Sequence, residues 1–535
     1  MSFVKNDITN EQLSLRDPWA ILSEREKRFL DKSWARYFAE YVFPKIDEAP
    51  YAVLYSKKDS RPNTPVNVQI GALILKEYTG QSDDEILASL LFDIRYRYAL
   101  HTTGFSEQPM SDRTLGRFRE RCNAYERETG IDLLHNTIES LANELATMMN
   151  IDRSLKRMDS LMVASNIKKL SRLELLYVTV SNLVEEMWRR ENKVPEELRH
   201  YLESGDRNVV IYHNKSEETE DKISRILREA KILKESCNGD YDESSNYQLL
   251  IRVLREQTVE EDGVYRLRKA EDGGMHSGMI QNPSDPDATY REKAGKQHRG
   301  YVGNLVESSG ENGSIVTDYQ YEPNNYSDSA FLRDALEKMG EQEEQVTLVA
   351  DGAYSGEGLD ICAAEKNVTL VNTNLTGKEP DEFLAGFELN EDETRVVKCP
   401  AGHEVKSCSF NKKTGQFTVS FHKTNCEGCP FKEQCHPKEY SRTCKKTFSV
   451  KGKHRAEQKK ARKTEAFKKF CHFRNGVEAL PSLLRRRYHV DHMPVRGKLR
   501  SRFFFGCKIA ALNFGKFCKF LQSAAKPAQM ALNEG

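Results

Sequence analysis

The chain has 535 residues, of which 38% are hydrophobic and 30% charged, and its 81 basic side chains balance 81 acidic ones. This length excludes one small domain and predicts several structural units around a sizeable core. No run of about eighteen apolar residues is present and the N-terminus lacks the regions of a signal peptide, so we expect a cytoplasmic protein without a membrane span.

Basic residues concentrate toward the C-terminus. Between Lys438 and Phe520 the chain has 24 lysines and arginines but only 5 aspartates and glutamates. An excess of this size predicts a surface that binds a polyanion, most simply nucleic acid. The alternative, a solvated helical face, is disfavoured by the length of the basic region.

The first 150 residues are predicted to be mainly helical, with a leader over residues 1–60 and a helical DNA-binding domain over residues 61–150. An apolar run from Val68 to Tyr78 predicts one helix. Ser82, followed by Glu85 three residues later, predicts a capping box at the start of the next. The helix after it is rich in arginine, which is typical of DNA binding, although a plain helical bundle has the same pattern.

Strand-like runs predict an α/β core with a mixed sheet, over residues 151–170 and 276–395. Val346–Ala350 leads into Asp351 and a glycine-rich turn, the pattern of a buried strand with a carboxylate at its end. Asp159 lies in a second strand-like run, and Asp152 is a nearby rival. An aspartate after a strand is often only the cap of the following helix, so neither residue identifies a site by itself.

Two insertions are expected in this core. Residues 171–275 are polar and acidic and predict a segment of helices alone. Residues 396–445 are rich in cysteine, and the spacing of Cys426, Cys429 and Cys435 is that of ligands to one structural zinc ion, with Cys399 as the fourth. A metal-free knuckle of packed thiols is the alternative interpretation. The competitors for the fourth position are His403, Cys408, His436 and Cys444.

The basic C-terminal part of the core, residues 446–522, precedes a tail over residues 523–535. We expect one long helix from His454 through Arg474 and a closing helix from Phe503 to Phe520. Glu478 lies between them, seven residues before Arg485, so the two side chains would share a helix face. Because proline is tolerated in the first turn of a helix, Pro481 would place Glu478 near a helix N-terminus.

Asp159, Asp351 and Glu478 thus form an acidic set in a chain with a basic region. Three carboxylates brought together bind two hard divalent cations, usually Mg²⁺, with Mn²⁺ as an alternative. Two such ions activate the attacking oxygen and stabilise the leaving oxygen of a phosphodiester.

At these residues the chain resembles DDE transposases of bacterial insertion sequences, and in particular the insertion-sequence eleven-eighty-two group. The resemblance covers roughly residues 60–520. The stretches that carry it are RMDSLMVASN around Asp159, SDPDATYREKAGKQHRGYVGN, LVADGAYSG around Asp351, CPAGH with CEGCPFKEQC, and RNGVEALPSLLRRRYHVDHMPVRG around Glu478.

This resemblance implies an RNase H-like core in which Asp159, Asp351 and Glu478 hold two Mg²⁺ ions. The implied reaction is cleavage at the ends of a mobile element, followed by attack of the exposed 3′-hydroxyl on target DNA. The implied partners are the terminal inverted repeats, target DNA and a second copy of the chain, at the bacterial nucleoid. The residues expected to contact DNA are Arg485, Arg474, Tyr488, Lys293 and Lys296, although a charged strand edge also explains the two lysines.

Three other interpretations share parts of this pattern. A transposase-derived protein that only binds DNA would differ in whether the three carboxylates converge. An RNase H-like nuclease would cut DNA without strand transfer. A zinc-dependent hydrolase is disfavoured because no histidine pair has catalytic spacing.

Overall fold

The structure is a computed structural model that describes residues 1–6, 22–58, 60–102, 110–212, 216–237, 239–293, 295–356, 358–375, 377 and 379–533. The chain divides into two compact units. Unit 1 comprises Met1–Arg153, Ser160–Ser327 and Leu480–Gly535, and unit 2 comprises Ser154–Asp159 and Asp328–Ala479. The strand β1 (Leu155–Ala164) therefore contributes residues to both units.

The N-terminal part of unit 1 is helical, as predicted. The predicted capping box is present, because Ser82 Oγ accepts from the Glu85 amide and Glu85 Oε2 accepts from the Ser82 amide at 2.7 Å. All residues from Val66 to Glu77 are buried. The α-helices are α1 (Glu24–Asp31), α2 (Trp34–Tyr37), α3 (Val66–Thr79), α4 (Asp83–Phe92), α5 (Ile94–Ala99), α6 (Thr114–Thr129) and α7 (Leu133–Met148).

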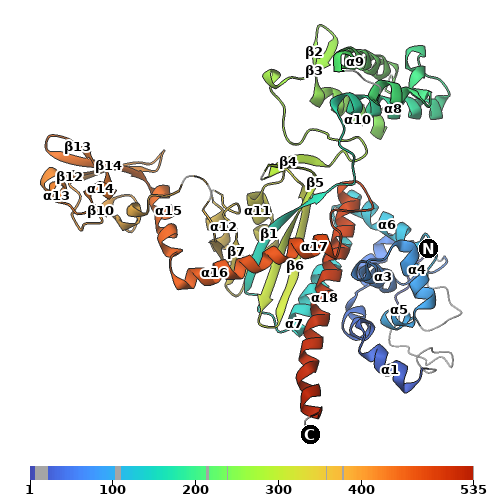
Figure 1. Cartoon of the computed structure of the whole chain (residues 1–535), viewed down its shortest axis with the longest axis horizontal. Helices are drawn as coiled ribbons and strands as arrows, with labels where there is room; N and C mark the ends of the chain where they lie inside the picture. Colours follow the sequence, from blue (N-terminus) through green and yellow to red (C-terminus); the bar gives the residue numbers. More distant parts are fainter. Residues whose placement is uncertain are drawn as a thin grey trace. The chain divides into compact units, whose positions relative to one another are not determined.

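The closing helix predicted at the C-terminus is α18 (Lys498–Asn533). It packs on α3, α7 and the strand β6 (Gly313–Pro323) (Figure 1). Gly506 permits this close approach, since a Cβ at that position would clash with the hydroxyl of Tyr319 on β6. The apolar C-terminal run therefore joins the helical N-terminal part to the strands of unit 1.

The segment predicted to contain helices alone also contains a hairpin. Its α-helices are α8 (Arg172–Glu191), α9 (Thr219–Ser236) and α10 (Ser245–Gln257). After α10, the strands β2 (Thr258–Glu261) and β3 (Val264–Leu267) pair antiparallel. Asp262 and Gly263 turn between them with positive φ angles of 50° and 75°. Asp-Gly is a strong hairpin signal, so the sequence did contain evidence for these strands.

The strands of unit 1 are antiparallel. β4 (Thr289–Lys293) pairs with β5 (Lys296–Gly310), and β5 pairs with β6. The end of β1 lies beside β5, where the Ser165 amide donates to the Arg299 carbonyl at 3.1 Å. Gly300 is required there, because its φ is 142° and a Cβ would clash with the Val163 carbonyl oxygen.

Unit 2 contains parallel strands flanked by helices. β7 (Val346–Ala350) pairs in parallel with both β1 and β8 (Val368–Asn372). The helices α11 (Asp328–Met339) and α12 (Leu359–Glu365) precede and follow β7 in the chain. With the antiparallel strands of unit 1, these elements confirm the predicted mixed α/β fold.

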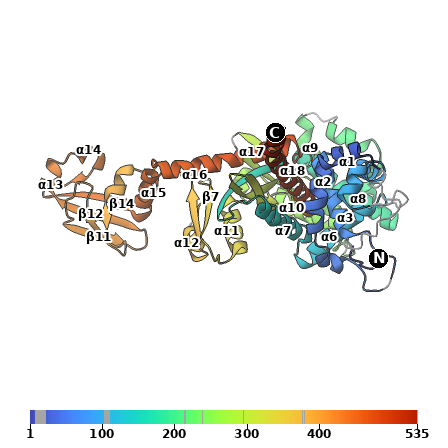
Figure 2. The same ribbon diagram turned by 90° about the horizontal axis from the view of Figure 1, so that it is seen from below.

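The cysteine-rich segment forms a small antiparallel sheet, ordered β11-β12-β14-β13 (Figure 2). Its core is apolar and mostly aromatic, and the Phe448 ring contacts those of Phe387 and Phe417. The strands are β11 (Ser407–Asn411), β12 (Gln416–His422), β13 (Lys438–Glu439) and β14 (Thr443–Ser449), with the short helices α13 (Lys423–Glu427) and α14 (Lys432–Cys435).

The prediction of one long helix from His454 through Arg474 is wrong. The structure has two helices, α15 (Val450–Ala461) and α16 (Glu465–Asn475). Thr464 starts the second, since its hydroxyl accepts from the Phe467 amide at 3.3 Å. Glu478 ends a short 3₁₀ turn directly before α17 (Ala479–Arg486), and Pro481 lies in the first turn of α17, as predicted.

Within the described ranges, no helix is both long enough and apolar enough to span a membrane.

Candidate active site

Asp159 lies in β1, and Asp351 directly follows the neighbouring parallel strand β7. In the register of β1 and β7, Arg157 lies opposite Val349, two residues before each aspartate. Successive side chains alternate between the two faces of a sheet, so Asp159 shares a face with Arg157.

Both aspartates, and Glu478, meet at the guanidinium of Arg474. Arg474 Nη2 lies 3.5 Å from Asp159 Oδ1 and 3.7 Å from Asp351 Oδ2. Arg474 Nη1 donates to Glu478 Oε1 at 2.9 Å, one helical turn along the chain. The side chain of Arg474 is 11% exposed and that of Glu478 is 62% exposed. All four residues belong to unit 2, so the three carboxylates surround one buried cation.

Arg157 and Gly476 hold the end of α16 against β1. Arg157 Nη1 donates to the carbonyl oxygen of Phe473 at 2.6 Å, and its guanidinium lies 5.1 Å from the centre of the Phe473 ring. A Cβ at Gly476 would clash with the same guanidinium. These contacts fix the helix end that carries Arg474, and thereby orient it toward the carboxylates.

The capping alternative for Asp351 does not describe the structure. Asp351 Oδ1 accepts from the Ala353 amide at 3.2 Å, which closes a local turn. The following helix, α12, begins only at Leu359 and has Gly358 as its N-cap residue. Asp152, the rival of Asp159, is exposed and lies before β1 begins.

The other basic candidates belong to unit 1 and differ in how accessible they are. Arg485 is exposed, with Nε 3.0 Å from Asp491 Oδ2 and Nη2 donating to the Met162 carbonyl at 2.9 Å. Lys293 and Lys296 are exposed and face each other at the end of the β4–β5 hairpin.

Tyr488 is not at the surface. It is 2% exposed, and its hydroxyl donates to the Ala511 carbonyl of α18 at 3.2 Å. Burial raises the pKa of Tyr488 to about 12. This placement argues against the contact with DNA expected from the sequence and instead makes Tyr488 a packing residue beneath α18.

The four cysteines expected at a zinc site line one small cavity of unit 2. Cys399, Cys426, Cys429 and Cys435 all face it, and His403 does as well. Burial raises the pKa of the Cys426 thiol to about 12, with a further contribution from neighbouring Cys444, and burial also raises the pKa of Cys435. Of the competing ligands, His436 lines a different cavity.

The three carboxylates and the four cysteines offer different ligand atoms and therefore suit different metals. Asp159, Asp351 and Glu478 offer only carboxylate oxygens, which suit Mg²⁺, whereas the cysteines offer sulfur, which suits zinc. In the part of the chain that the structure describes, neither group has three ligand atoms within 4.8 Å of one another. Both groups would have to draw together around an ion.

Two regions of the chain match family models. Residues 398–518 match a model described as Transposase DDE domain, and residues 25–121 match one described as Transposase domain (DUF772). Both matches are to transposases. A transposase DDE domain implies transposition activity and DNA as a partner. In the same comparisons, no curated protein and no solved structure matches the chain.

Only one of the two matches covers part of the candidate site. The match to a transposase DDE domain includes Glu478, Arg474 and the cysteine-rich sheet, whereas Asp159 and Asp351 lie outside both matched regions. The convergence of the aspartates with Glu478 is therefore an observation of the structure that is independent of the family matches.

Several contacts at the candidate site were not predicted from the sequence. Arg474 was expected to contact DNA and Arg157 was assigned no role, because their partners lie far away in the chain. Among the described residues, His135, Glu139 and Asp318 in unit 1 have the spacing of metal ligands, and this group was not predicted either. His135 Nε2 lies 2.8 Å from Asp318 Oδ1, which joins α7 to β6. Only the spacing of His135 and Glu139 on one helix face was visible in the sequence.

Proposed function

We propose that the chain is a DNA transposase that cleaves the ends of a mobile element and joins the exposed 3′-hydroxyls to target DNA. Its catalytic carboxylates are Asp159, Asp351 and Glu478. The observation that supports this most strongly is that three carboxylates from distant parts of the chain lie around one guanidinium, that of Arg474. The match to a transposase DDE domain supports the same class of reaction.

The three carboxylates would hold Mg²⁺, or Mn²⁺ in its place. Bound there, the ions would activate the attacking water or 3′-hydroxyl and stabilise the negative charge on the leaving oxygen. Glu478 is the most exposed of the three side chains, at 62%. It is therefore the carboxylate that can adjust most easily as the ligands draw together.

Arg474 prepares the site before a cation arrives. Three carboxylates at short distance repel one another, and a guanidinium among them offsets this repulsion. A divalent cation supplies the same compensation, and its charge repels the guanidinium. Arg474 would then leave the centre of the site, where its donors become available to a phosphate of bound DNA.

The chain would also bind DNA phosphates and a structural zinc ion. Arg485, Lys293 and Lys296 would contact phosphates, which adds affinity without reading the sequence. Cys399, Cys426, Cys429 and Cys435 would hold a structural zinc ion. Two copies of the chain would bring two element ends together as a homodimer.

The test compares purified wild type with Asp351→Asn on DNA that carries the element's own ends, with Mg²⁺ and with EDTA. Asparagine keeps the side-chain oxygen that accepts from the Ala353 amide, so the local turn is preserved. We expect wild type to cleave and join with Mg²⁺ alone, and the variant to bind the ends but do neither. Equal binding with no cleavage by either protein would support the DNA-binding remnant, and cleavage without joining would support the nuclease.

A further inference from the structure

Unit 1 contains a polar pocket that is distinct from the group of carboxylates in unit 2. Its volume is about 420 Å³, which is in the range of small-ligand sites. Residues of α3, α4, α6 and α18 line it, together with the segment that follows α17. Its charged lining residues are Lys76, Glu77, Asp83, Arg119, Arg487 and Lys508.

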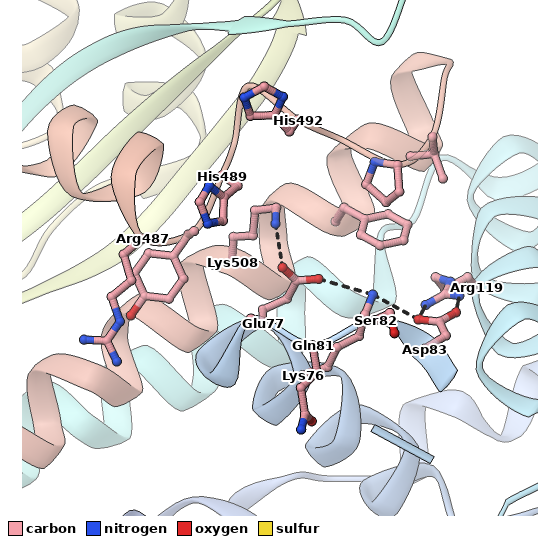
Figure 3. A pocket seen from close by; sticks show the side chains of 15 residues that line it. Lys76, Glu77, Gln81, Ser82, Asp83, Arg119, Arg487, His489, His492 and Lys508 are labelled. Carbon is pink, nitrogen blue, oxygen red and sulfur yellow. Dashed lines mark hydrogen bonds and ion pairs between the residues drawn. The ribbon is translucent and has the colours of Figure 1, made fainter. Parts of the chain in front are cut away.

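Five of these charges form one continuous chain of ion pairs (Figure 3). Lys508 Nζ lies 2.5 Å from Glu77 Oε2, and Lys76 Nζ lies 3.5 Å from Glu77 Oε1 and 2.9 Å from Asp83 Oδ1. Arg119 ends the chain with its own ion pair to Asp83. The Lys76 and Lys508 side chains are each only 7% exposed. Three cations thus share two carboxylates in a largely buried group.

A further cation and two histidines line the pocket from the segment after α17. Arg487 is exposed, and its guanidinium lies 5.2 Å from the centre of the Tyr78 ring and 5.6 Å from that of Tyr488. His489 and His492 are also exposed and are drawn on the same side of the pocket in Figure 3. The lining therefore carries more positive than negative charge. Because a charge removed from water is stabilised by an opposite charge, an anion fits this pocket.

The hydrogen-bond donors of the pocket indicate which class of anion it can bind. Lysine and arginine only donate hydrogen bonds, so the ligand must supply several acceptor oxygens, as a phosphate does. Pro494 and Val495 add an accessible apolar surface to the same pocket, whereas Phe504 is only 5% exposed beneath Lys76 and Arg119. Apolar side chains of this kind pack against the sugars and bases of nucleic acids.

We infer that this pocket binds a nucleotide phosphate, with the phosphate at Arg487 and the buried lysines and the nucleoside against Pro494 and Val495. The source is either one unit of a DNA strand or a free nucleotide. The inference rests on the proposed function only in that DNA is the expected source of the phosphate. It does not depend on the three carboxylates.

The test measures equilibrium binding of a labelled DNA duplex and of deoxyadenosine monophosphate to the full chain. The variants are Arg487→Gln and, as matched control, Arg486→Gln, since Arg486 is the neighbouring exposed arginine and does not line the pocket. We expect Arg487→Gln to weaken binding about tenfold, the effect of losing one charge-assisted hydrogen bond. Arg486→Gln should retain wild-type affinity for the nucleotide. Both arginines are exposed, so neither substitution should lower the melting temperature.

The two probes separate the two sources of phosphate. Competition by the free nucleotide would assign the pocket to nucleotides as such, and Arg487-dependent binding of DNA alone would assign it to a strand. Equal affinities of the two variants for both probes would overturn the inference.

The outcome is also distinguishable from failure of the proposed function. An inactive wild type whose DNA binding still depends on Arg487 would refute the transposase proposal alone. An active wild type in which Arg487→Gln binds like Arg486→Gln would refute the pocket alone.

Discussion

At the scale of single residues, Arg474 controls the candidate site before any cation binds. Its guanidinium is within 3.7 Å of the carboxylate oxygens of Asp159, Asp351 and Glu478. Without it, three carboxylates would repel one another at the surface of β1 and β7. Arg474 is thus expected both to stabilise the metal-free protein and to compete with metal ions.

Replacement of Arg474 by glutamine should separate these two effects. We expect the free energy of unfolding without divalent cations to fall by about 1–3 kcal/mol, the range for losing charged hydrogen bonds. The affinity for Mn²⁺ should rise about tenfold, because the competing charge is gone. Denaturant unfolding and calorimetric Mn²⁺ titration measure the two quantities, with Arg474→Lys as the control that keeps the charge. Weaker Mn²⁺ binding by Arg474→Gln would show that Arg474 assembles the site and does not compete.

Tyr488 gives a second prediction, from its burial. Tyr488→Phe should leave DNA affinity unchanged and lower stability by about 1 kcal/mol, through loss of the hydrogen bond to the Ala511 carbonyl. The pKa of Tyr488 is raised to about 12 from the usual value of about 10, so its contribution to stability is complete below pH 10 and lost as pH rises through 12. The stability of the wild type should therefore fall more steeply than that of Tyr488→Phe between pH 10 and pH 12. A marked loss of DNA affinity in Tyr488→Phe would contradict its role in packing.

The sequence indicated the candidate carboxylates more clearly than it indicated the residues that surround them. Asp351 was visible because an apolar run ends at it, and Glu478 was singled out by its spacing from Arg485 and by the resemblance. Asp159, however, lies inside a strand and was identified only by resemblance. The roles of Arg474 and Arg157 depend on contacts across hundreds of residues, which no local pattern encodes.

At the scale of elements, the small sheet β11–β14 has a small apolar core. Its buried core consists of six residues, Phe387, Val396, Phe417, Val419, Phe421 and Phe448. Small units of this kind usually need a metal or disulfides, and all cysteines here are free thiols. A zinc ion held by the four cysteines would therefore stabilise these strands.

We expect about one zinc ion per chain, and its removal by a chelator should lower the melting temperature by several degrees. Because the pKa of the Cys426 thiol is about 12 without metal, zinc must displace its proton, and zinc affinity should rise with pH. Elemental analysis and calorimetry of Cys429→Ser test this, with Cys362→Ser on α12 as the control. Full stability of Cys429→Ser without zinc would favour the metal-free knuckle.

At the scale of the whole molecule, the chain order of elements followed from the sequence while their division into units did not. Val346–Ala350 was predicted as a strand with its observed bounds. The division between units runs through β1, at Asp159, where no change in composition marks a boundary. The long basic helix also failed as a prediction, because a single hydroxyl, that of Thr464, starts a new helix.

The central claim is that Asp351 acts in catalysis as a metal ligand. The most direct measurement is the cleavage rate of Asp351→Cys on the element's ends with Mg²⁺ and with Mn²⁺. Because a thiolate binds Mn²⁺ better than Mg²⁺, we expect the variant to be inactive with Mg²⁺ and partly active with Mn²⁺. Activity of Asp351→Cys equal to wild type with Mg²⁺, or equal loss with both ions, would contradict the claim.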